Sequence, residues 1–300
     1  MEYIIGVDAG GTKTEAAAFD REGGILASAI SGFGNLLIDP QLAIQHILEA
    51  ICECRQRATG NCTYLVLGVA GMGSGLYRGE LEAAISNLGI PYHITNDAHL
   101  AHAALLQGRD GCLAIAGTGS VCYGVRAGKH EMTGGWGHLL GDEGSGYWIV
   151  MEAFKAMTRQ WDRSRSLSPL SQALLEKLGL LDPPAIKSFI YAKTKGEVAA
   201  LVPVIVHQAR LGDMDAGRIL EEAGCFLGEM VLANLKRLGF EGETPIAMKG
   251  SILVHIPEVQ DAFKARIRSR QPKALILDKD LSAAAGGYYL SPRATKEERI

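Results

Sequence analysis

The chain has 300 residues, of which 47% are hydrophobic and 21% charged, and its formal net charge at pH 7 is −3. This length predicts two domains, and this composition is that of a globular protein, so disordered, collagen-like and fibrous classes are excluded. The small negative charge offers no general attraction to nucleic acid or to an anionic membrane, and we expect neither as a partner.

The start of the chain, Met1 to Ile5, carries no basic segment and runs directly into a strand pattern, so we expect no signal peptide. No apolar stretch approaches the ~20 residues of a membrane span. The six cysteines form no CxxC pair, and most stand in apolar stretches, which is typical of reduced core thiols. We therefore expect a cytoplasmic protein.

The first half of the chain alternates short strand patterns with helical ones. Strands are expected at residues 4–7, 14–19, 25–27, 64–69 and 91–95. Asp39 and Pro40 supply an N-cap and a first-turn proline for a helix that runs to about Ala58. This alternation predicts a mixed sheet covered by helices, with the functional site in the loops at the strand ends.

A repeated order of elements links the two halves of the chain. Residues 4–27 and residues 112–133 both read strand, Gly-Thr-x-[Ser/Thr], strand, turn, strand. The two copies are too far apart for a solenoid, so we interpret them as two copies of one domain rather than as a chance likeness of two glycine hairpins. We expect domains over 1–107 and 108–282, the second rich in helices and the first completed by a helix over 283–300.

The segment from Asp8 to Thr14 ends a strand and opens a hairpin. Glycines there let backbone N–H groups approach a polyphosphate, threonine hydroxyls add donors, and Asp8 can hold Mg²⁺, often through water. A tight turn without a ligand is the alternative for one such loop. A second loop of the same build at Gly117 favours a nucleotide clamp between two domains, although the chain has no P-loop motif.

These two loops, the segment GGWGHLLGDEGSGYWI at 134–149 and the late Gly250-Ser251 together resemble the actin-like sugar-kinase superfamily. Within it the chain looks like the group of N-acetylglucosamine kinases and BadF/BcrA-type ATPases, from Gly6 to about Gly287. The resemblance implies an α/β fold of two ribonuclease-H-like domains around a cleft, with ATP between the two loops and the sugar near the hinge. It further implies Mg²⁺, a homodimer, and transfer of phosphate to an amino sugar, first of all to the 6-hydroxyl of N-acetylglucosamine.

The resemblance assigns the nucleotide to the two loops and to the late glycine–hydroxyl pair. The residues concerned are Gly10, Gly11, Thr12, Lys13, Thr14, Gly117, Thr118, Gly119, Ser120, Gly250 and Ser251. Asp97 matches the aspartate that takes the proton from the acceptor hydroxyl, because a carboxylate at a strand end can orient that hydroxyl for in-line attack. The alternative is that Asp97 only caps the following helix, in which case Asp142 is the next candidate base.

For the sugar, Asn35 matches the family's substrate-binding asparagine. The segment that matches its sugar wall contains Gly135, Trp136, Gly137 and Asp142. An amide and a carboxylate suit sugar hydroxyls because both accept hydrogen bonds. Trp136 either stacks on the sugar or belongs to the core, and His138 either contacts the sugar or orders its loop.

The chain departs from the eukaryotic N-acetylglucosamine kinases where they carry a serine that touches the sugar. Ala70 or Gly71 stands at that place. The identity of the amino substituent therefore stays open, and glucosamine, N-acetylmuramic acid and glucose are alternative substrates.

Other functions have weaker support in the sequence. Cys52, Cys54, Cys62 and His46 have the elements of a metal site, but Cys52 is expected on the apolar stripe of a helix and the spacing matches no usual zinc site. The rival function is an ATPase that activates a partner enzyme, as BadF/BcrA-type activators do. Such activators hold an iron–sulfur cluster through cysteines, for which Cys112 and Cys122 are the candidates here.

Overall fold

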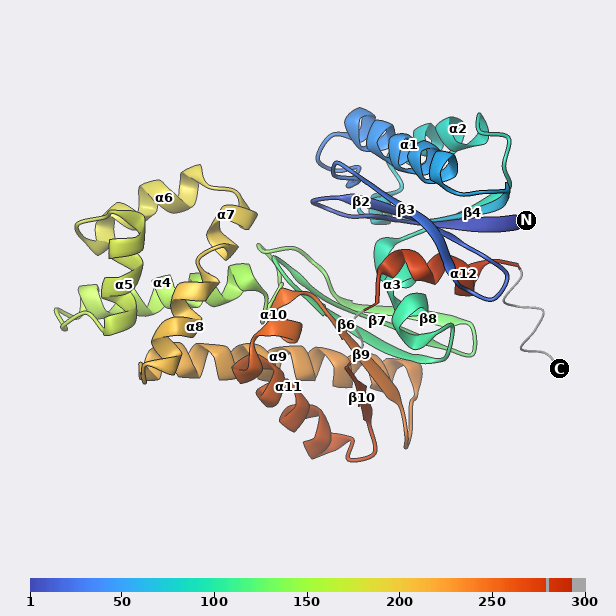
Figure 1. Ribbon diagram of the computed structural model, residues 1–300. Coiled ribbons are helices and arrows are strands. Elements are labelled where there is room, and N and C mark those ends of the chain that lie inside the picture. The colour runs from blue at the N-terminus through green and yellow to red at the C-terminus, as the bar shows by residue number, and fades with distance from the viewer. Residues whose placement is uncertain (279–280, 293–300) are drawn as a thin grey trace. The chain divides into compact units, whose positions relative to one another are not determined.

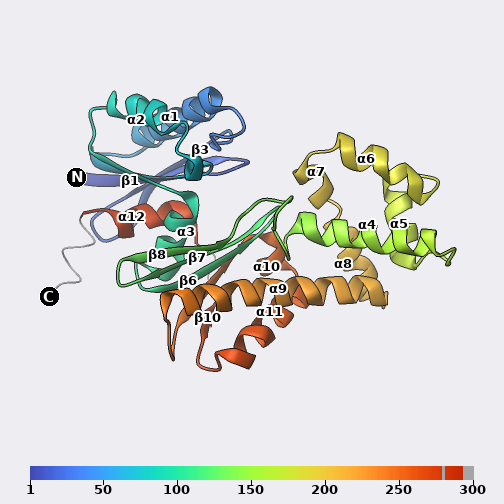
Figure 2. The same cartoon turned by 180° about the vertical axis from the view of Figure 1, so that it is seen from behind.

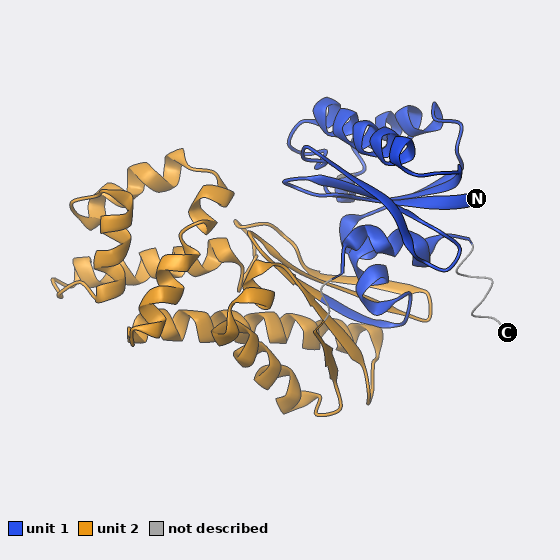
Figure 3. Ribbon diagram, in the orientation of Figure 1, with its two compact units in different colours: residues 1–113, 279–300 blue, residues 114–278 orange. Residues whose placement is uncertain are grey.

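The computed structural model of the protein describes residues 1–278 and 281–292 (Figure 1). The chain divides into two compact units (Figure 3). Unit 1 contains residues 1–113 and the described C-terminal segment 281–292, and unit 2 contains residues 114–278. The domain change predicted at residues 107 and 108 lies a few residues before this division. Among the described residues, no helix combines the length and the apolar character that crossing a membrane requires.

Unit 1 contains one five-stranded mixed sheet. Its elements are β1 (Glu2–Ala9), β2 (Thr14–Phe19), β3 (Ile25–Ser31), α1 (Pro40–Arg57), β4 (Asn61–Val69), η1 (Met72–Ser74), α2 (Arg78–Ser86), β5 (Tyr92–Thr95), α3 (Asp97–Leu106), η3 (Ala283–Ala285) and α12 (Gly286–Leu290). The strand order is β3-β2-β1-β4-β5. The first three strands are antiparallel, whereas β4 runs parallel to β1 and β5 parallel to β4.

Unit 2 repeats this arrangement. Its sheet begins with β6 (Gly111–Ala116), a strand that the division between the units crosses. The other elements are β7 (Ser120–Arg126), β8 (Lys129–Gly134), α4 (Gly146–Asp162), α5 (Pro169–Leu178), η2 (Pro183–Ala185), α6 (Ile186–Ala192), α7 (Lys195–Ala199), α8 (Val202–Arg210), α9 (Met214–Leu238), β9 (Pro245–Lys249), α10 (Ser251–His255), α11 (Pro257–Arg270) and β10 (Leu275–Leu277). Its strand order is β10-β9-β6-β7-β8. When it is listed from the other edge, as β8-β7-β6-β9-β10, it matches the order β3-β2-β1-β4-β5 of unit 1 strand for strand. The predicted class, α/β with two mixed sheets flanked by helices, is confirmed.

The helices α4 to α8 form a lobe at one end of unit 2, away from its sheet (Figures 1 and 2). They lie in the chain between the edge strand β8 and the long helix α9. Unit 1 has no counterpart of this lobe in its described residues, where the third strand leads directly to α1. The lobe makes unit 2 the helix-rich half.

Helix α1 shows how the sequence produces the core of unit 1. Asp39 caps it by accepting a 3.0 Å hydrogen bond from the backbone N–H of Leu42, and Pro40 stands in its first turn. Its buried residues are Ala43, Ile47, Ala50, Ile51 and Cys54, a helical spacing that packs on the sheet.

Within residues 1–278 and 281–292, the cysteines of unit 1 differ in burial and are not gathered into a group of three ligating residues. Burial raises the pKa of the Cys54 thiol to about 11, so this thiol stays protonated. The expectation that Cys52 lies on the apolar stripe is wrong: Cys52 is exposed, because each helical position turns the side chain by about 100° and the stripe passes through its neighbours. No cluster of three metal-ligating residues occurs in the part of the chain that the structure describes.

The C-terminal segment returns to unit 1 and packs against β1 and α3 at a distance that only glycine allows. A Cβ on Gly6 would collide with the carbonyl oxygen of Ala284, and a Cβ on Gly286 with that of Leu100. Ser282 donates a 2.7 Å hydrogen bond to Glu15. The helix predicted over 283–300 ends at Leu290, and residues 293–300 of that prediction lie outside the described residues.

Substituting Gly6 tests this close packing. Gly6→Ala should lower the free energy of unfolding by about 2–3 kcal/mol, because the added methyl group meets rigid backbone. Gly79→Ala in α2 is the matched control, since a Cβ there meets nothing within 4 Å. It should leave stability unchanged or raise it by up to ~1 kcal/mol. Equal stability of the two variants in urea titrations would contradict the packing.

Candidate functional site

The hairpin between β1 and β2 forms the first predicted phosphate loop. Gly10 closes it with a 2.9 Å hydrogen bond from its N–H to the carbonyl of Lys13. Gly11 and Thr12 are exposed at the tip. A Cβ on Gly11 would meet nothing within 4 Å, and its φ is not left-handed, so neither packing nor backbone geometry calls for glycine there. The bare tip leaves backbone N–H groups open to an anion.

The two side chains after this tip, those of Lys13 and Thr14, differ in their surroundings. The Lys13 ammonium pairs with Glu15 at 2.9 Å at the surface. Thr14 is 0% exposed, and its hydroxyl has no hydrogen-bond partner within residues 1–278 and 281–292. The Thr14 hydroxyl is thus buried inside unit 1, and its assignment to the nucleotide stays a prediction.

Three further predicted residues lie at the same edge of the sheet as this hairpin. Because β1, β4 and β5 are parallel, their carboxyl ends meet at one edge, which carries Asp8, the turn after β4, and Asp97. Asn35 joins them through backbone hydrogen bonds. Gly34 donates to Gly10 at 2.8 Å.

The turn that carries Asn35 is held from both sides. The N–H of Leu36 donates to the carbonyl of Ala70 at 3.2 Å, and the N–H of Ala70 donates to Ala9 at 2.8 Å. The side-chain oxygen of Asn35 accepts from Leu37, so the group that Asn35 can offer a ligand is its NH₂. A Cβ on Gly71 would lie 2.6 Å from that oxygen, which excludes a serine at position 71.

Asp97 is the first residue of α3 and is half-buried. The cap of this helix is Asn96, whose side chain accepts a 2.7 Å hydrogen bond from the N–H of His99. The alternative that Asp97 serves as the N-cap is therefore wrong. The Asp97 carboxylate stands in the first turn of α3, at the positive end of the helix dipole, where a negative charge stabilises the helix.

The second predicted loop joins β6 to β7 and rests on the first turn of α4. The N–H groups of Gly146 and Tyr147 donate to the carbonyls of Gly117 and Thr118, at 2.7 and 3.3 Å. Thr118 is exposed, and a Cβ on Gly117 would meet nothing within 4 Å, as at Gly11 in the first loop. Both loops thus present bare glycine backbone.

Asp142 lies beneath this second loop and is 5% exposed. The N–H of Ser120 donates to its carboxylate at 3.5 Å, and a Cβ on Gly119 would lie 2.9 Å from the same carboxylate. The φ of Asp142 is +61°, an unusual conformation for a residue with a side chain. In unit 2 its carboxylate faces the loop, where it orders the backbone around Ser120.

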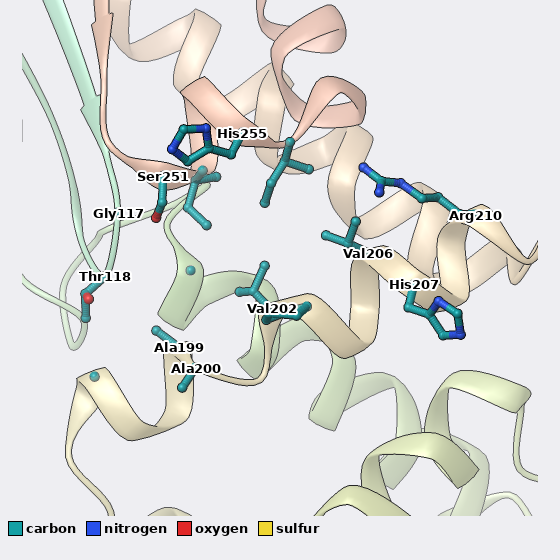
Figure 4. A pocket seen from close by; sticks show the side chains of 15 residues that line it. Gly117, Thr118, Ala199, Ala200, Val202, Val206, His207, Arg210, Ser251 and His255 are labelled. Atoms are coloured by element: carbon teal, nitrogen blue, oxygen red, sulfur yellow. The ribbon is translucent and has the colours of Figure 1, made fainter. Parts of the chain in front are cut away.

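A pocket of about 570 Å³ opens beside the second loop (Figure 4). Of the predicted residues, Gly117, Thr118 and Ser251 line it. The remaining walls come from the first turn of α4, from α10 and its end, and from the helical lobe: Gly146, Ile252, His255, Ile256, Gly196, Ala199, Ala200, Val202, Pro203, Val206, His207 and Arg210. Sequence reasoning missed the lobe residues, because small apolar residues on short helices look like core residues.

The geometry of the pocket depends on local signals in the chain. Gly250 has a φ of +93°, and a Cβ on it would collide with the backbone of Ala116, so the turn into α10 requires glycine. Helix α7 begins at a capping box between Thr194 and Glu197. Hydrogen bonds from Lys193 and Thr194 lower the pKa of Glu197 to about 2, so its carboxylate stays charged. Arg210, at the far end of the pocket from Thr118 in Figure 4, forms a 2.8 Å ion pair with Glu258.

The glycine-rich segment after β8 exposes apolar side chains. Trp136 is 73% exposed, so the alternative that it is a core residue is wrong. Gly135 and Gly137 on either side have left-handed φ values, which give the segment its sharp course. The ring of His138 packs edge-on against Tyr147 at 4.9 Å, which ties the segment to α4.

Comparison with known proteins places the chain among phosphate-transferring proteins. A family model described as the BadF/BadG/BcrA/BcrD ATPase family matches residues 5–286. The chain is 29% identical to an N-acetylmuramic acid/N-acetylglucosamine kinase of Clostridium acetobutylicum, over 97% of this chain and 98% of that protein. It is 30% identical to an N-acetyl-D-glucosamine kinase of Dictyostelium discoideum, over 98% and 99%.

A solved structure agrees with these matches. It is that of a Chromobacterium violaceum protein described as a candidate N-acetylglucosamine kinase, with a TM-score of 0.76 and 27% identity. The match covers 96% of this chain and 98% of that one. The likeness therefore extends over both units, including the fold that the sequence resemblance implied.

Filling the pocket tests whether it holds the nucleotide. Val206→Trp should weaken ATP binding by about tenfold or more, because the indole occupies volume that a base and ribose would need. Leu211→Trp, at an exposed position just after α8, is the control and should bind ATP as the wild type does. If calorimetry finds that Val206→Trp binds ATP with unchanged affinity, the nucleotide does not bind in this pocket.

Proposed function

The chain belongs to the BadF/BadG/BcrA/BcrD ATPase family, and we propose that it is an ATP-dependent kinase of amino sugars with N-acetylglucosamine as its main substrate. The observation that carries the proposal is the match, over nearly the whole chain, to two kinases of N-acetylated amino sugars. N-acetylmuramic acid is the alternative acceptor, since one of these relatives is named for both sugars.

The nucleotide half of the proposal rests on unit 2. The pocket between α10 and the helices α7 and α8 takes the base and ribose, with Ser251 on one wall and Val202 on the facing one (Figure 4). Burial of the base against apolar side chains supplies affinity. The backbone N–H groups around Gly117 and the exposed Thr118 hydroxyl then face the phosphates.

The residues of unit 1 fit a magnesium ion as well. Asp8 offers a half-buried carboxylate at the end of β1, and Mg²⁺ in kinases is held by one or two carboxylates together with phosphate and water oxygens. When bound, the ion neutralises charge that develops on the transferred phosphate. Asp8 would hold it, directly or through water, next to the bare tip of the first hairpin.

Asp97 and Asn35 supply the sugar chemistry. The Asp97 carboxylate accepts the proton of the attacking hydroxyl, for which we propose the 6-hydroxyl, and directs its oxygen toward the γ-phosphate. The NH₂ group of Asn35 donates to another sugar hydroxyl. Trp136 is exposed and can stack on the sugar ring or its acyl group.

A partner-activating ATPase is the second candidate because the family is named for ATPases. It has less support from the cysteines. Cys112 and Cys122 are both 0% exposed, whereas a cluster shared between two subunits needs thiols at a surface. A visible absorbance that bleaches on reduction after anaerobic purification would favour this candidate.

An ADP-release assay tests the proposal directly. The purified protein is given ATP and Mg²⁺ with glucose, glucosamine, N-acetylglucosamine, N-acetylmannosamine or N-acetylmuramic acid. We expect ADP release that depends on the sugar and is fastest with N-acetylglucosamine. ADP release at the same rate without any sugar would overturn the proposal. Omitting Mg²⁺ should abolish turnover, and size-exclusion chromatography tests the homodimer, which stays a prediction.

Substituting Asp97 tests the base. Asp97→Asn should lower turnover by roughly 10²–10⁴-fold, the usual share of general-base catalysis, because an amide cannot accept the proton. The fold should survive, since Asn96 rather than Asp97 caps the helix. Asp162→Asn, at the exposed end of α4, is the control and should keep full activity. A sugar Kd within a few-fold of wild type would locate the defect in the chemical step, whereas near-normal turnover would exclude Asp97 as the base.

A further inference from the structure

Thr14 is a buried polar residue that the proposed chemistry does not use. It begins β2, where it pairs with Ala9 of β1 and with Ser31 of β3. Alternation along the strand puts its side chain on the same face as Ala16 and Ala18, which belong to the core under α1. The side chain is 0% exposed, and its hydroxyl finds no hydrogen-bond partner anywhere in residues 1–278 and 281–292. Buried hydroxyls are nearly always paired, so this one calls for an explanation.

The neighbour of this hydroxyl is the turn that carries Asn35. A Cβ on Gly34 would lie 2.6 Å from the Thr14 hydroxyl oxygen and 2.5 Å from the Cβ of Ala9. Gly34 therefore lets the turn lie directly on Thr14. The same residue donates its N–H to Gly10 of the phosphate hairpin, at 2.8 Å. Thr14 thus stands where the turn with the sugar-binding asparagine meets the phosphate hairpin.

The turn that lies on Thr14 carries two backbone carbonyls, those of Phe33 and Gly34. The carbonyl of Phe33 is already engaged by the ring of His46 at 2.8 Å. Gly34 is the residue that lies directly on Thr14, and its carbonyl is the next acceptor along the chain.

We propose that Thr14 is a positioning residue that couples sugar binding to the phosphate hairpin: its hydroxyl, unpartnered without ligand, bonds the carbonyl of Gly34 when a sugar engages Asn35. The proposal rests on the proposed function, because it takes Asn35 as a sugar contact. It replaces the expectation that the Thr14 hydroxyl donates to phosphate. The hydrogen bond from Thr14 to Gly34 adds to the affinity for the sugar. It also draws the turn of Asn35 toward Gly10, whose carbonyl already accepts a hydrogen bond from the N–H of Gly34.

The test compares three variants of the full chain. Thr14→Val keeps the shape and removes the hydroxyl, Thr14→Ser keeps the hydroxyl and removes the methyl group, and Thr12→Val changes the exposed threonine of the same hairpin. For each we would measure the melting temperature without ligand, the Kd for N-acetylglucosamine and the Kd for a non-hydrolysable ATP analogue.

For Thr14→Val we expect a melting temperature equal to or above that of the wild type, because an unsatisfied group has been removed. We expect its sugar Kd to rise about tenfold, the equivalent of one hydrogen bond, with a nucleotide Kd within about twofold of wild type. Thr14→Ser should lose stability but keep sugar affinity. Thr12→Val should weaken nucleotide binding and spare the sugar. If Thr14 had only a structural role, Thr14→Val would not raise the melting temperature and weaken sugar binding at the same time.

Three results would overturn the coupling. A lower melting temperature for Thr14→Val means that the hydroxyl is already partnered without ligand. A loss of nucleotide affinity with unchanged sugar affinity makes Thr14 a phosphate contact. If Thr14→Val binds both the sugar and the nucleotide analogue as the wild type does, Thr14 has no role in ligand binding. If the wild type binds no N-acetylglucosamine, the proposed function fails and the coupling to sugar with it, whereas the melting temperatures still decide whether the hydroxyl is unpartnered.

Discussion

The parallel pairing of β1 with β4, and of β4 with β5, is the constraint on which the site in unit 1 depends. Parallel strands end at the same edge of a sheet, so three chain segments that are distant in sequence deliver Asp8, the turn at Ala70 and Asp97 to one place. Backbone hydrogen bonds from Gly34 to Gly10 and from Leu36 to Ala70 add the turn of Asn35 to that edge. The side chains proposed for catalysis are thereby held by backbone rather than by one another.

Unit 2 uses the same strand order for a different task. Its first hairpin also ends in a bare glycine, but this hairpin rests on the N-terminus of α4, where two helical N–H groups donate to the carbonyls of Gly117 and Thr118. The helix and the lobe that follows it then build the walls of a pocket that unit 1 does not share among its described residues. One fold, present twice, thus carries a site of polar side chains in one copy and an apolar pocket in the other.

Local departures from low-energy geometry concentrate around these two loops. Asp142 holds a left-handed backbone beneath the second loop, and Thr14 holds an unpartnered hydroxyl beneath the first, as far as the described residues show. Neither feature helps the ligand-free chain to fold, since a left-handed aspartate and an unsatisfied hydroxyl both oppose stability. Features of this kind are typical of places where a ligand completes the structure.

The sequence by itself determined the local elements and the chemistry of the loops. Strand patterns, the Asp39-Pro40 helix start and the two Gly-Thr-x-[Ser/Thr] hairpins depend on neighbouring residues, and the repeat of the hairpins already indicated two copies of one fold. The family resemblance rested on the same short segments. All of these are properties of contiguous chain, which is why they could be read without a structure.

Only the tertiary structure decided which of those residues are exposed and which are buried. Thr12 and Thr14 look equivalent in the sequence, yet strand alternation and the overlying Gly34 bury one and leave the other at the tip. Asn96 and Asp97 are both good caps, and the backbone at the helix start selects Asn96. The lobe residues that line the pocket carry no motif, because a methyl group becomes a pocket wall or a core contact according to what packs across from it. Packing between segments distant in sequence decides these outcomes, and no local pattern encodes it.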